Sequence, residues 1–507
     1  MDNPKRVAFC AFDISTTAAG VAVRSSDGQE DFAAVDIRGA TTWRDDPNFP
    51  GFDLAELPDM LDECMRILQG GGWDFDRSGE DTPGYVSVAC RQHDMVVLDK
   101  QDNPLLPAIS WQCNAAAAEV ATLQQLGVED SIGPMAPRFV LPKLMCVLNT
   151  AGGTGPSRDE IGTVFMTGDW LAAELTGVKS MSTSDALSNG LLDQQTRQRA
   201  DDAIAAAGLD IAWFPQVAKS GQVVAPILDE APEGSAWSDM IALLGNYNFV
   251  AGLGDNHASA VGCGMMSAND ASGDAALIVS AGTSGTINLA CPIAAAPKAS
   301  DILQFEFYND SVMLLLMLAD CGAWYSRFLA QFPESETSDL DALNEMAISS
   351  DFSQIRRVVH CDVQHRELPS PARSGIAELT ADTQFSIALE LLLRIKQMVD
   401  AASGDSGPIT RHVVLTGGLS QSLFFQQVFH TGVQLLISDC RVAISARTGP
   451  LRYKTTASGA IVNAELPISG SLGAIEGRAS RFAETECGQP DESQRAQLVY
   501  LLRSYGI

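Results

Sequence analysis

Apolar runs that end in loops of glycine, serine, threonine and aspartate occur at the start of both halves of this 507-residue chain. Val7–Phe12 is a strand-like run that leads into Asp13-Ile14-Ser15-Thr16-Thr17, and Ala275–Ser280 leads into Gly282-Thr283-Ser284-Gly285. Runs bounded in this way by turn residues are typical of buried strands. Because strands and helical segments then alternate along the chain, the sequence predicts an α/β fold, and the repeated opening suggests a duplicated domain.

The length of the chain favours two domains over one core. The segment from Phe249 to Gly264 has the pattern of a short strand, a Gly-Asp loop and a small-residue helix, and Met266–Asp274 after it is small and polar. We therefore expect one domain over residues 1–265 and a second over residues 266–507. Helical periodicity predicts helices over Leu54–Leu68 and Phe385–Val399.

Charge and cysteine content exclude several partner classes. Lys and Arg total 33 against 63 Asp and Glu, a net charge of −30, which repels phosphate backbones and anionic lipid, so we expect no nucleic acid and no membrane partner. The apolar run Val7–Phe12 is short for a signal peptide, and Val312–Ala319 is far below the roughly 20 residues that span a bilayer. The 11 cysteines form no C-x-x-C pair, which favours reduced thiols. A cytoplasmic location is expected, and a homodimer is left open.

Asp13-Ile14-Ser15-Thr16-Thr17 has the residue types of a magnesium and phosphate site. A carboxylate at a strand end suits Mg²⁺, which takes one or two carboxylates plus substrate phosphates, and hydroxyls with backbone N–H groups suit phosphate oxygens. The alternative is a turn that these side chains stabilise themselves. Gly282-Thr283-Ser284-Gly285 leaves the same choice between phosphate loop and tight turn, and no Gly-Lys-Ser or Gly-Lys-Thr follows to make it a Walker loop.

Three further strand ends carry polar or glycine-rich segments. Asp255, in Gly254-Asp255-Asn256, is a candidate general base for a substrate hydroxyl, or else a helix N-cap. Gln92-His93-Asp94 offers donors and acceptors for a polyhydroxy ligand, or else forms a solvated loop. Gly417-Gly418 leaves room for a flat adenine against the backbone, or else makes a strand-to-helix turn.

The order of these motifs along the chain is more specific than any one of them. In chain order they are Asp13-x-Ser15-Thr16-Thr17, Gln92-His93, the stretch Asp99–Gln112, Lys143-Leu144, Asp169-Trp170-Leu171, Leu175-Thr176-Gly177, Gly254-Asp255-Asn256, Gly282-Thr283-Ser284, Gly417-Gly418 and Ser458-Gly459-Ala460. From about Val7 to Ala464 the chain resembles the FGGY family of carbohydrate kinases, which includes xylulokinase, glycerol kinase, fuculokinase and gluconokinase.

The resemblance implies two actin-like (ribonuclease H-like) ATPase domains flanking a central cleft, with sugar bound mainly by the first and ATP mainly by the second. By position, Asp13 would help to hold Mg²⁺ and Asp255 would be the catalytic base. The residues that would contact ATP are Thr16, Thr17, Gly282, Thr283, Gly417 and Gly418. Those that would line the sugar site are Gln92, His93, Asp94, Trp111 and Asn256.

Several positions depart from the family pattern. Ser15 stands where the first phosphate loop usually has Gly, and Cys113 and Ala115 replace the Asp and Arg that usually follow the tryptophan. Gln364–Pro369 only partly keeps a Gly-Glu-Arg-x-Pro stretch, and a Glu expected before the late Gly-Ala is replaced around Lys454. These changes predict a divergent sugar pocket.

The expected function is transfer of the γ-phosphoryl group of ATP, with Mg²⁺, to a primary hydroxyl of a small sugar or polyol, a ketopentose of the xylulose type being favoured. A non-catalytic sugar or nucleotide sensor derived from such a kinase is the alternative, motivated by the altered pocket residues. An actin-like filament protein is disfavoured, because Gln92-His93 and Gly254-Asp255-Asn256 would then have no role.

Overall fold

The structure of the protein is a computed structural model of the 507-residue chain. It describes all residues except 1–4, 151–154, 266–275, 283, 294–295, 298–301, 309–310, 319, 333–339, 351–353, 356, 358–375, 403–409, 411, 446–450, 452–453 and 471–483. The Gln364–Pro369 stretch therefore lies outside the described residues.

Two compact units make up the chain, and neither is continuous in sequence. The first unit comprises Met1–Gly262, Gln304–Tyr308 and Thr448–Ala479, and the second comprises Cys263–Leu303, Asn309–Arg447 and Ser480–Ile507. Two later segments thus return to the first unit. The expected division into functional domains at residues 1–265 and 266–507 stays a prediction.

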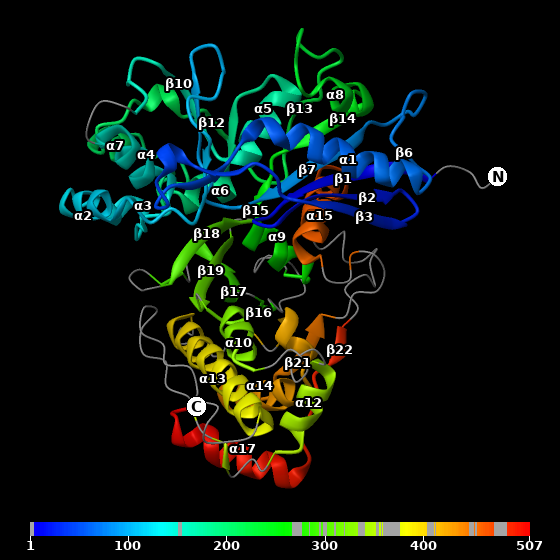
Figure 1. The fold of residues 1–507 in the computed structure, drawn as a ribbon, viewed down its shortest axis with the longest axis vertical. Helices are drawn as coiled ribbons and strands as arrows, with labels where there is room; N and C mark the ends of the chain where they lie inside the picture. The colour runs from blue at the N-terminus through cyan, green and yellow to red at the C-terminus, as the bar shows by residue number, and fades with distance from the viewer. Residues whose placement is uncertain are drawn as a thin grey trace. The chain divides into compact units, whose positions relative to one another are not determined.

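A mixed sheet forms the centre of the first unit, with strand order β13-β14-β7-β1-β2-β3, while β15 pairs with β7 and β6 with β1 (Figure 1). Its strands are β1 (Lys5–Ile14), β2 (Ala18–Ser25), β3 (Glu30–Asp36), β6 (Trp73–Asp74), β7 (Gly84–Cys90), β13 (Val223–Pro226), β14 (Tyr247–Val250) and β15 (Leu253–Gly254). Strands β1 and β2 are antiparallel and form a hairpin whose tip carries Ser15, Thr16 and Thr17, and Gly28, with a φ of 91°, lies in the turn after β2. Strands β1, β14 and β15 all run parallel to β7.

Smaller strands extend the first unit around this sheet. They are β4 (Ala40–Thr42), β5 (Pro50–Phe52), β8 (Val96–Asp99), β9 (Ala108–Ile109), β10 (Ile161–Phe165), β11 (Ser180–Ser182) and β12 (Gln216–Ala218). They pair as β4-β5-β9, β8-β10 and β11-β12. Strand β18 (Leu303–Phe307) belongs to the first unit from Gln304 onward.

The helices of the first unit are α1 (Leu57–Gly70), α2 (Ala117–Gln125), α3 (Glu129–Ile132), α4 (Val140–Asn149), α5 (Thr167–Thr176), α6 (Thr183–Ser188), α7 (Asp201–Ala206), α8 (Ser238–Leu244), α9 (Asp255–Gly262) and α15 (Thr455–Ser469). Helix α1 confirms the first periodicity: its apolar face is buried, and Asp53 caps the short turn before it by accepting from the Ala55 N–H at 3.0 Å.

Helix α15 comes from far along the chain and packs on one face of the first sheet. Asn463 Nδ2 donates to Ser87 Oγ on β7 at 2.7 Å, and Glu465 pairs at 2.8 Å with the buried Arg24 of β2. Helix α9 crosses α15 so closely that a Cβ at Gly459 would lie 1.8 Å from the Ala258 carbonyl oxygen. Because a side chain there would separate the helices, the small residue of Ser458-Gly459-Ala460 is a packing requirement.

The second unit is built on a sheet whose order includes β19-β17-β16-β20-β21-β22. These strands are β16 (Leu277–Ala281), β17 (Gly285–Pro292), β19 (Ser311–Leu318), β20 (His412–Thr416), β21 (Arg441–Ser445) and β22 (Glu484–Glu486). Its helices are α10 (Gly322–Leu329), α12 (Leu340–Ile348), α13 (Ile376–Ala402), α14 (Leu423–Leu436) and α17 (Glu492–Ser504).

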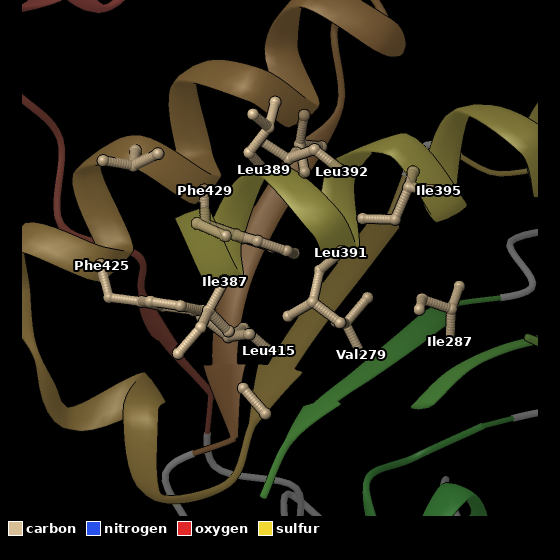
Figure 2. Close-up of a cluster of buried hydrophobic side chains, with 14 of the residues drawn as sticks. Val279, Ile287, Ile387, Leu389, Leu391, Leu392, Ile395, Leu415, Phe425 and Phe429 are labelled. Carbon is tan, nitrogen blue, oxygen red and sulfur yellow. The ribbon is translucent and has the colours of Figure 1, made fainter. Parts of the chain in front are cut away.

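The core of the second unit lies between this sheet and helices α13 and α14. Figure 2 shows Leu391 of α13 and Phe429 of α14 above Val279 of β16 and Leu415 of β20, all of them buried. The helix expected over Phe385–Val399 is confirmed, and α13 extends beyond both ends of that range. Its apolar periodicity does not mark the full length, because polar residues of α13 are buried as well.

Two absences concern the described part of the chain. No helix in it is long and apolar enough to cross a membrane. Its cysteines are all free, which agrees with the scattered spacing in the sequence.

Candidate active site

Three parallel strands of the first unit end side by side, and each end carries candidate site residues. In the register of β1 and β7, Asp13 lies opposite Ala89, and in that of β15 and β7, Gly254 lies opposite Cys90. Asp255 follows β15, and the polar segment that includes His93 follows β7. Because side chains at the carboxyl ends of parallel strands share one edge of a sheet, the fold brings Asp13 and Asp255 together.

Asp13 is a half-buried carboxylate in a mixed electrostatic environment. The pKa of Asp13 is raised to about 7, chiefly by burial and in addition by the negative charge of Asp255, while the positive charge of Lys454 acts in the opposite direction. Lys454 directly precedes α15, and its Nζ lies 5.1 Å from the centre of the Phe32 ring. A nearby cation offsets the repulsion between two such carboxylates.

Asp255 is the first residue of α9. Its Oδ1 accepts from the backbone N–H of the next residue, Asn256, at 2.8 Å. An N-cap side chain accepts instead from an N–H two or three residues further on, so this bond is not that of the alternative capping role. Burial raises the pKa of Asp255 to about 6, while the Asn256 N–H lowers it. A carboxylate with a pKa near the working pH is suited to act as a general base.

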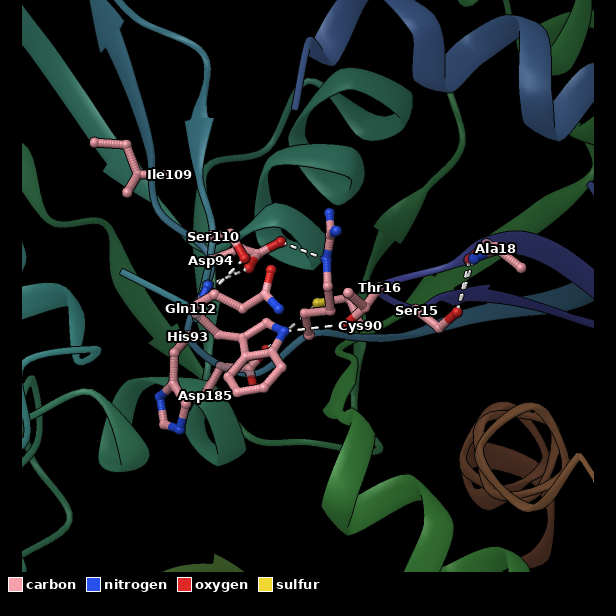
Figure 3. Close-up of polar contacts among 12 residues, drawn as sticks. Ser15, Thr16, Ala18, Cys90, His93, Asp94, Ile109, Ser110, Gln112 and Asp185 are labelled. Atoms are coloured by element: carbon pink, nitrogen blue, oxygen red, sulfur yellow. Dashed lines mark hydrogen bonds and ion pairs between the residues drawn. The ribbon is translucent and has the colours of Figure 1, made fainter. Parts of the chain in front are cut away.

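The segment after β7 is held by charge pairs and links two of the predicted groups of residues. Asp94 is fully buried; it pairs with Arg91 Nε at 2.6 Å and accepts from the Trp111 backbone N–H at 2.9 Å. The Trp111 indole Nε1 in turn donates to Thr16 Oγ1 at 3.0 Å (Figure 3). Asp94 therefore holds the backbone of Trp111. The Trp111 side chain links the β1–β2 tip to the residues that are expected to bind the sugar.

His93 is held in one tautomer by Asn189. The Asn189 amide Nδ2 donates to the Gln92 and Asp185 carbonyls, both at 2.8 Å, and its Oδ1 accepts from the Val140 N–H at 3.0 Å. Since these bonds settle which end of the amide is oxygen, His93 Nδ1, at 3.1 Å from Oδ1, carries the proton. Burial lowers the pKa of His93 well below its ordinary value, so Nε2 is a neutral acceptor.

Gln92 and Asn256 are the remaining residues that are expected to line the sugar site. Gln92 Nε2 lies 3.2 Å from Nδ1 of the buried His257, whose pKa burial lowers to about 3. A neutral imidazole nitrogen accepts from the Gln92 amide, which leaves the amide oxygen of Gln92 as an acceptor. Asn256, next to Asp255 on α9, is half-buried.

The glycine-rich loops of the second unit lie at the ends of two adjacent strands. Strands β16 and β20 are parallel, with Ser280 opposite Thr416. Gly417 has a φ of 95°, and a Cβ there would lie 2.5 Å from the Ala281 carbonyl carbon. A Cβ at Gly418 would meet nothing within 4 Å, so its backbone is open to a flat group. Gly282 is next to this contact, and Thr283 lies outside the described residues.

Functional candidates that the sequence left without a role are Asn189, Arg91 and Lys143. Lys143 is fully buried on α4, where it interrupts the apolar run Val140–Leu144. A single charged residue within an apolar run is a signal that identifies Lys143 from the sequence. Asn189 lacks such a signal, because its partner His93 is 96 residues away in sequence. Arg91 pairs locally, with Asp94 three residues on. Of the altered pocket positions, Cys113 is fully buried and belongs to the core.

The residues present fit the cofactors that the fold implies. Among the described residues no cluster of three or more His, Cys, Asp or Glu side chains is arranged to hold a metal. The single carboxylate of Asp13 fits Mg²⁺, which keeps several waters and binds substrate phosphates in addition. The open backbone at Gly418 fits a nucleotide base, and exposed Thr17 with half-buried Thr16 places hydroxyls at the β1–β2 tip.

Comparison with known proteins identifies the family. The sequence pattern described as "FGGY family of carbohydrate kinases, N-terminal domain" matches residues 9–262, half of the chain. The chain belongs to the FGGY family of carbohydrate kinases. The expected α/β fold is confirmed as the FGGY fold: the chain matches the ligand-bound xylulose kinase of Lactobacillus acidophilus with a TM-score of 0.77 at 15% identity, over 99% of this chain and 97% of that one.

Curated relatives align over part of their length. Xylulose kinase of Escherichia coli (strain K12) is 26% identical over 328 residues, 63% of this chain and 62% of that protein. Autoinducer-2 kinase of Escherichia coli (strain SMS-3-5 / SECEC) is 26% identical over 243 residues, 45% of this chain and 43% of that protein. These alignments thus span less than two thirds of each relative.

Proposed function

We propose that this FGGY protein is an ATP- and Mg²⁺-dependent kinase that transfers the γ-phosphoryl group to a primary hydroxyl of a small sugar or polyol. The observation that carries the proposal is the pair formed by Asp13 and Asp255 at the ends of β1 and β15, on either side of β7. A general base and a metal-binding carboxylate must lie close together for phosphoryl transfer, because nucleophile and phosphate meet there.

Asp255 is the proposed base. Its carboxylate accepts the proton of the attacking hydroxyl, and its pKa of about 6 leaves it ionised at neutral pH. Bound Mg²⁺ would neutralise phosphate charge. Asp13 would hold that cation and Thr16 and Thr17 would contact phosphate oxygens. The residues of the second unit that would contact the nucleotide are Gly282, Thr283, Gly417 and Gly418.

The sugar-binding assignment rests on the acceptors at the end of β7. His93 Nε2 accepts from a substrate hydroxyl because Asn189 keeps the proton on Nδ1. Gln92 and Asn256 offer amide groups to the remaining hydroxyls, and the indole of Trp111, 37% exposed, offers an apolar face. Asp94 acts through Trp111 and is assigned a supporting role.

A ketopentose of the xylulose type is the proposed substrate. The relative aligned over the longest stretch named above is a xylulose kinase, whereas another relative is an autoinducer-2 kinase. The acceptors around His93 suit the hydroxyl donors of such a sugar.

The test is ATP consumption with Mg²⁺ across ketoses, aldoses, polyols and aldonates, beside an Asp255→Asn variant. We expect turnover on one sugar class, its loss in the variant, and nearly unchanged ATP binding by calorimetry, since Asn keeps the shape and removes the base. An active Asp255→Asn variant would refute the base assignment. Wild-type silence across the panel with ATP bound would favour the sensor.

A further inference from the structure

Lys143 connects the two segments that carry the proposed sugar residues. Its side chain is fully buried, and Nζ donates to the carbonyl oxygens of His93 at 2.5 Å, Ser110 at 3.1 Å and Ile109 at 3.2 Å. An ammonium group has three N–H donors, so the three carbonyls use all of them. His93 follows β7, and Ser110 directly precedes Trp111.

Burying a lysine side chain here carries a desolvation free-energy cost that packing alone does not explain. Burial lowers the pKa of Lys143 to about 8, with the negative charge of Asp94 acting in the opposite direction. A leucine or methionine would fill the same volume without the desolvation cost. Three carbonyl oxygens that converge on one point repel one another, however, and a buried cation with three donors satisfies them together.

The same two segments are joined a second time. The Trp111 backbone N–H donates to Asp94 at 2.9 Å, one residue beyond the His93 carbonyl and one residue beyond the Ser110 carbonyl. Together, the Lys143 hydrogen bonds and the Trp111–Asp94 hydrogen bond fix both the separation and the relative rotation of the two chain segments. A single connection would let the segments rotate about it. The His93 ring is further fixed by stacking on Phe139, with ring centres 4.7 Å apart.

We propose that Lys143 is a positioning residue for the sugar: by binding the His93, Ile109 and Ser110 carbonyls it sets the distance between the His93 imidazole and the Trp111 indole. This inference rests on the proposed function. Lys143 touches no substrate itself. Its loss should therefore weaken sugar binding while the nucleotide, assigned to other residues, is bound as before.

The experiment compares Lys143→Met with Leu144→Met, a buried control on the same helix whose side chain has no hydrogen-bond donor for the three carbonyls. Calorimetry measures sugar binding without ATP, and steady-state kinetics measures both KM values. For Lys143→Met we expect sugar affinity to fall at least tenfold, with the ATP KM within twofold of wild type. Leu144→Met should leave both unchanged.

Lys143→Arg covers the case in which Lys143→Met does not fold. It keeps the buried charge, but a planar guanidinium does not donate to three carbonyls that converge on one atom, so the same selective loss of sugar affinity is expected. Unchanged sugar affinity in a folded variant, or equal losses for sugar and ATP, would overturn the inference. A wild type that neither binds nor phosphorylates any sugar would instead refute the proposed function and this inference with it.

Discussion

Replacing Gly459 with alanine tests the crossing of α15 and α9, on which the position of Asp255 depends. The new Cβ would lie 1.8 Å from the Ala258 carbonyl oxygen and 2.5 Å from its carbon. An ordinary carbon–oxygen approach is about 3.3 Å, so the helices must separate locally by roughly 1.5 Å. The obstructing atoms are backbone and cannot rotate away. A Cβ at Gly262 would meet the Thr455 carbonyl oxygen at 1.9 Å, so both helices need a glycine here.

Overpacking of this kind costs about 1–3 kcal/mol. Alanine has the higher helix propensity and offsets up to about 1 kcal/mol of that. Since the obstruction is backbone, the upper end of this cost applies, and the net loss after the propensity gain is about 2 kcal/mol. With an unfolding entropy of about 2.1 cal/mol/K per residue, a unit of roughly 300 residues then melts about 3 °C lower. Because Ala258 is one turn after Asp255 on α9, kcat should fall as well.

Calorimetric melting and kcat are measured on Gly459→Ala and on Gly70→Ala. Gly70 is also helical, at the end of α1, but a Cβ there would meet nothing within 4 Å. Its replacement should leave kcat unchanged and either leave stability unchanged or raise it by up to about 1 kcal/mol. If Gly459→Ala melted and turned over like wild type, the close crossing would be refuted.

Three further predictions concern other parts of the first unit. Arg24→Met leaves two glutamates without their buried cation, and should cost about 3–5 kcal/mol in urea unfolding; Arg38→Met, in an exposed pair, should cost under about 1 kcal/mol. Because burial raises the pKa of Asp255 to about 6, its carboxylate is protonated below that pH, so kcat/KM at saturating Mg²⁺ should fall tenfold per pH unit there; activity retained at pH 4.5 would contradict this. Asn189→Leu frees the tautomer of the neighbouring imidazole and should raise the sugar KM about tenfold; an equal rise in the ATP KM would contradict its role.

Local sequence pattern was sufficient for the strands that carry candidate site residues at their ends, and for those residues. An apolar run that stops at Asp13, or at the Gly254-Asp255 pair, identifies a buried strand and its polar end without any knowledge of its neighbours. The helix at α1 was likewise predictable, because its 3.6-residue periodicity faces a core whichever core it is.

Only the tertiary structure decided what lies around those strand ends. Asn189 fixes the His93 tautomer from 96 residues away, and Lys143 binds carbonyls on two segments that are apart in sequence. Lys454 lies near enough to Asp13 to affect its pKa because the segment Thr448–Ala479 belongs to the first unit, although most of the second unit precedes it in the sequence. Sequence periodicity reports whether a residue faces a core or solvent. It carries no information on which distant backbone group completes a hydrogen bond or shifts a pKa, because strand pairing and helix packing determine those partners.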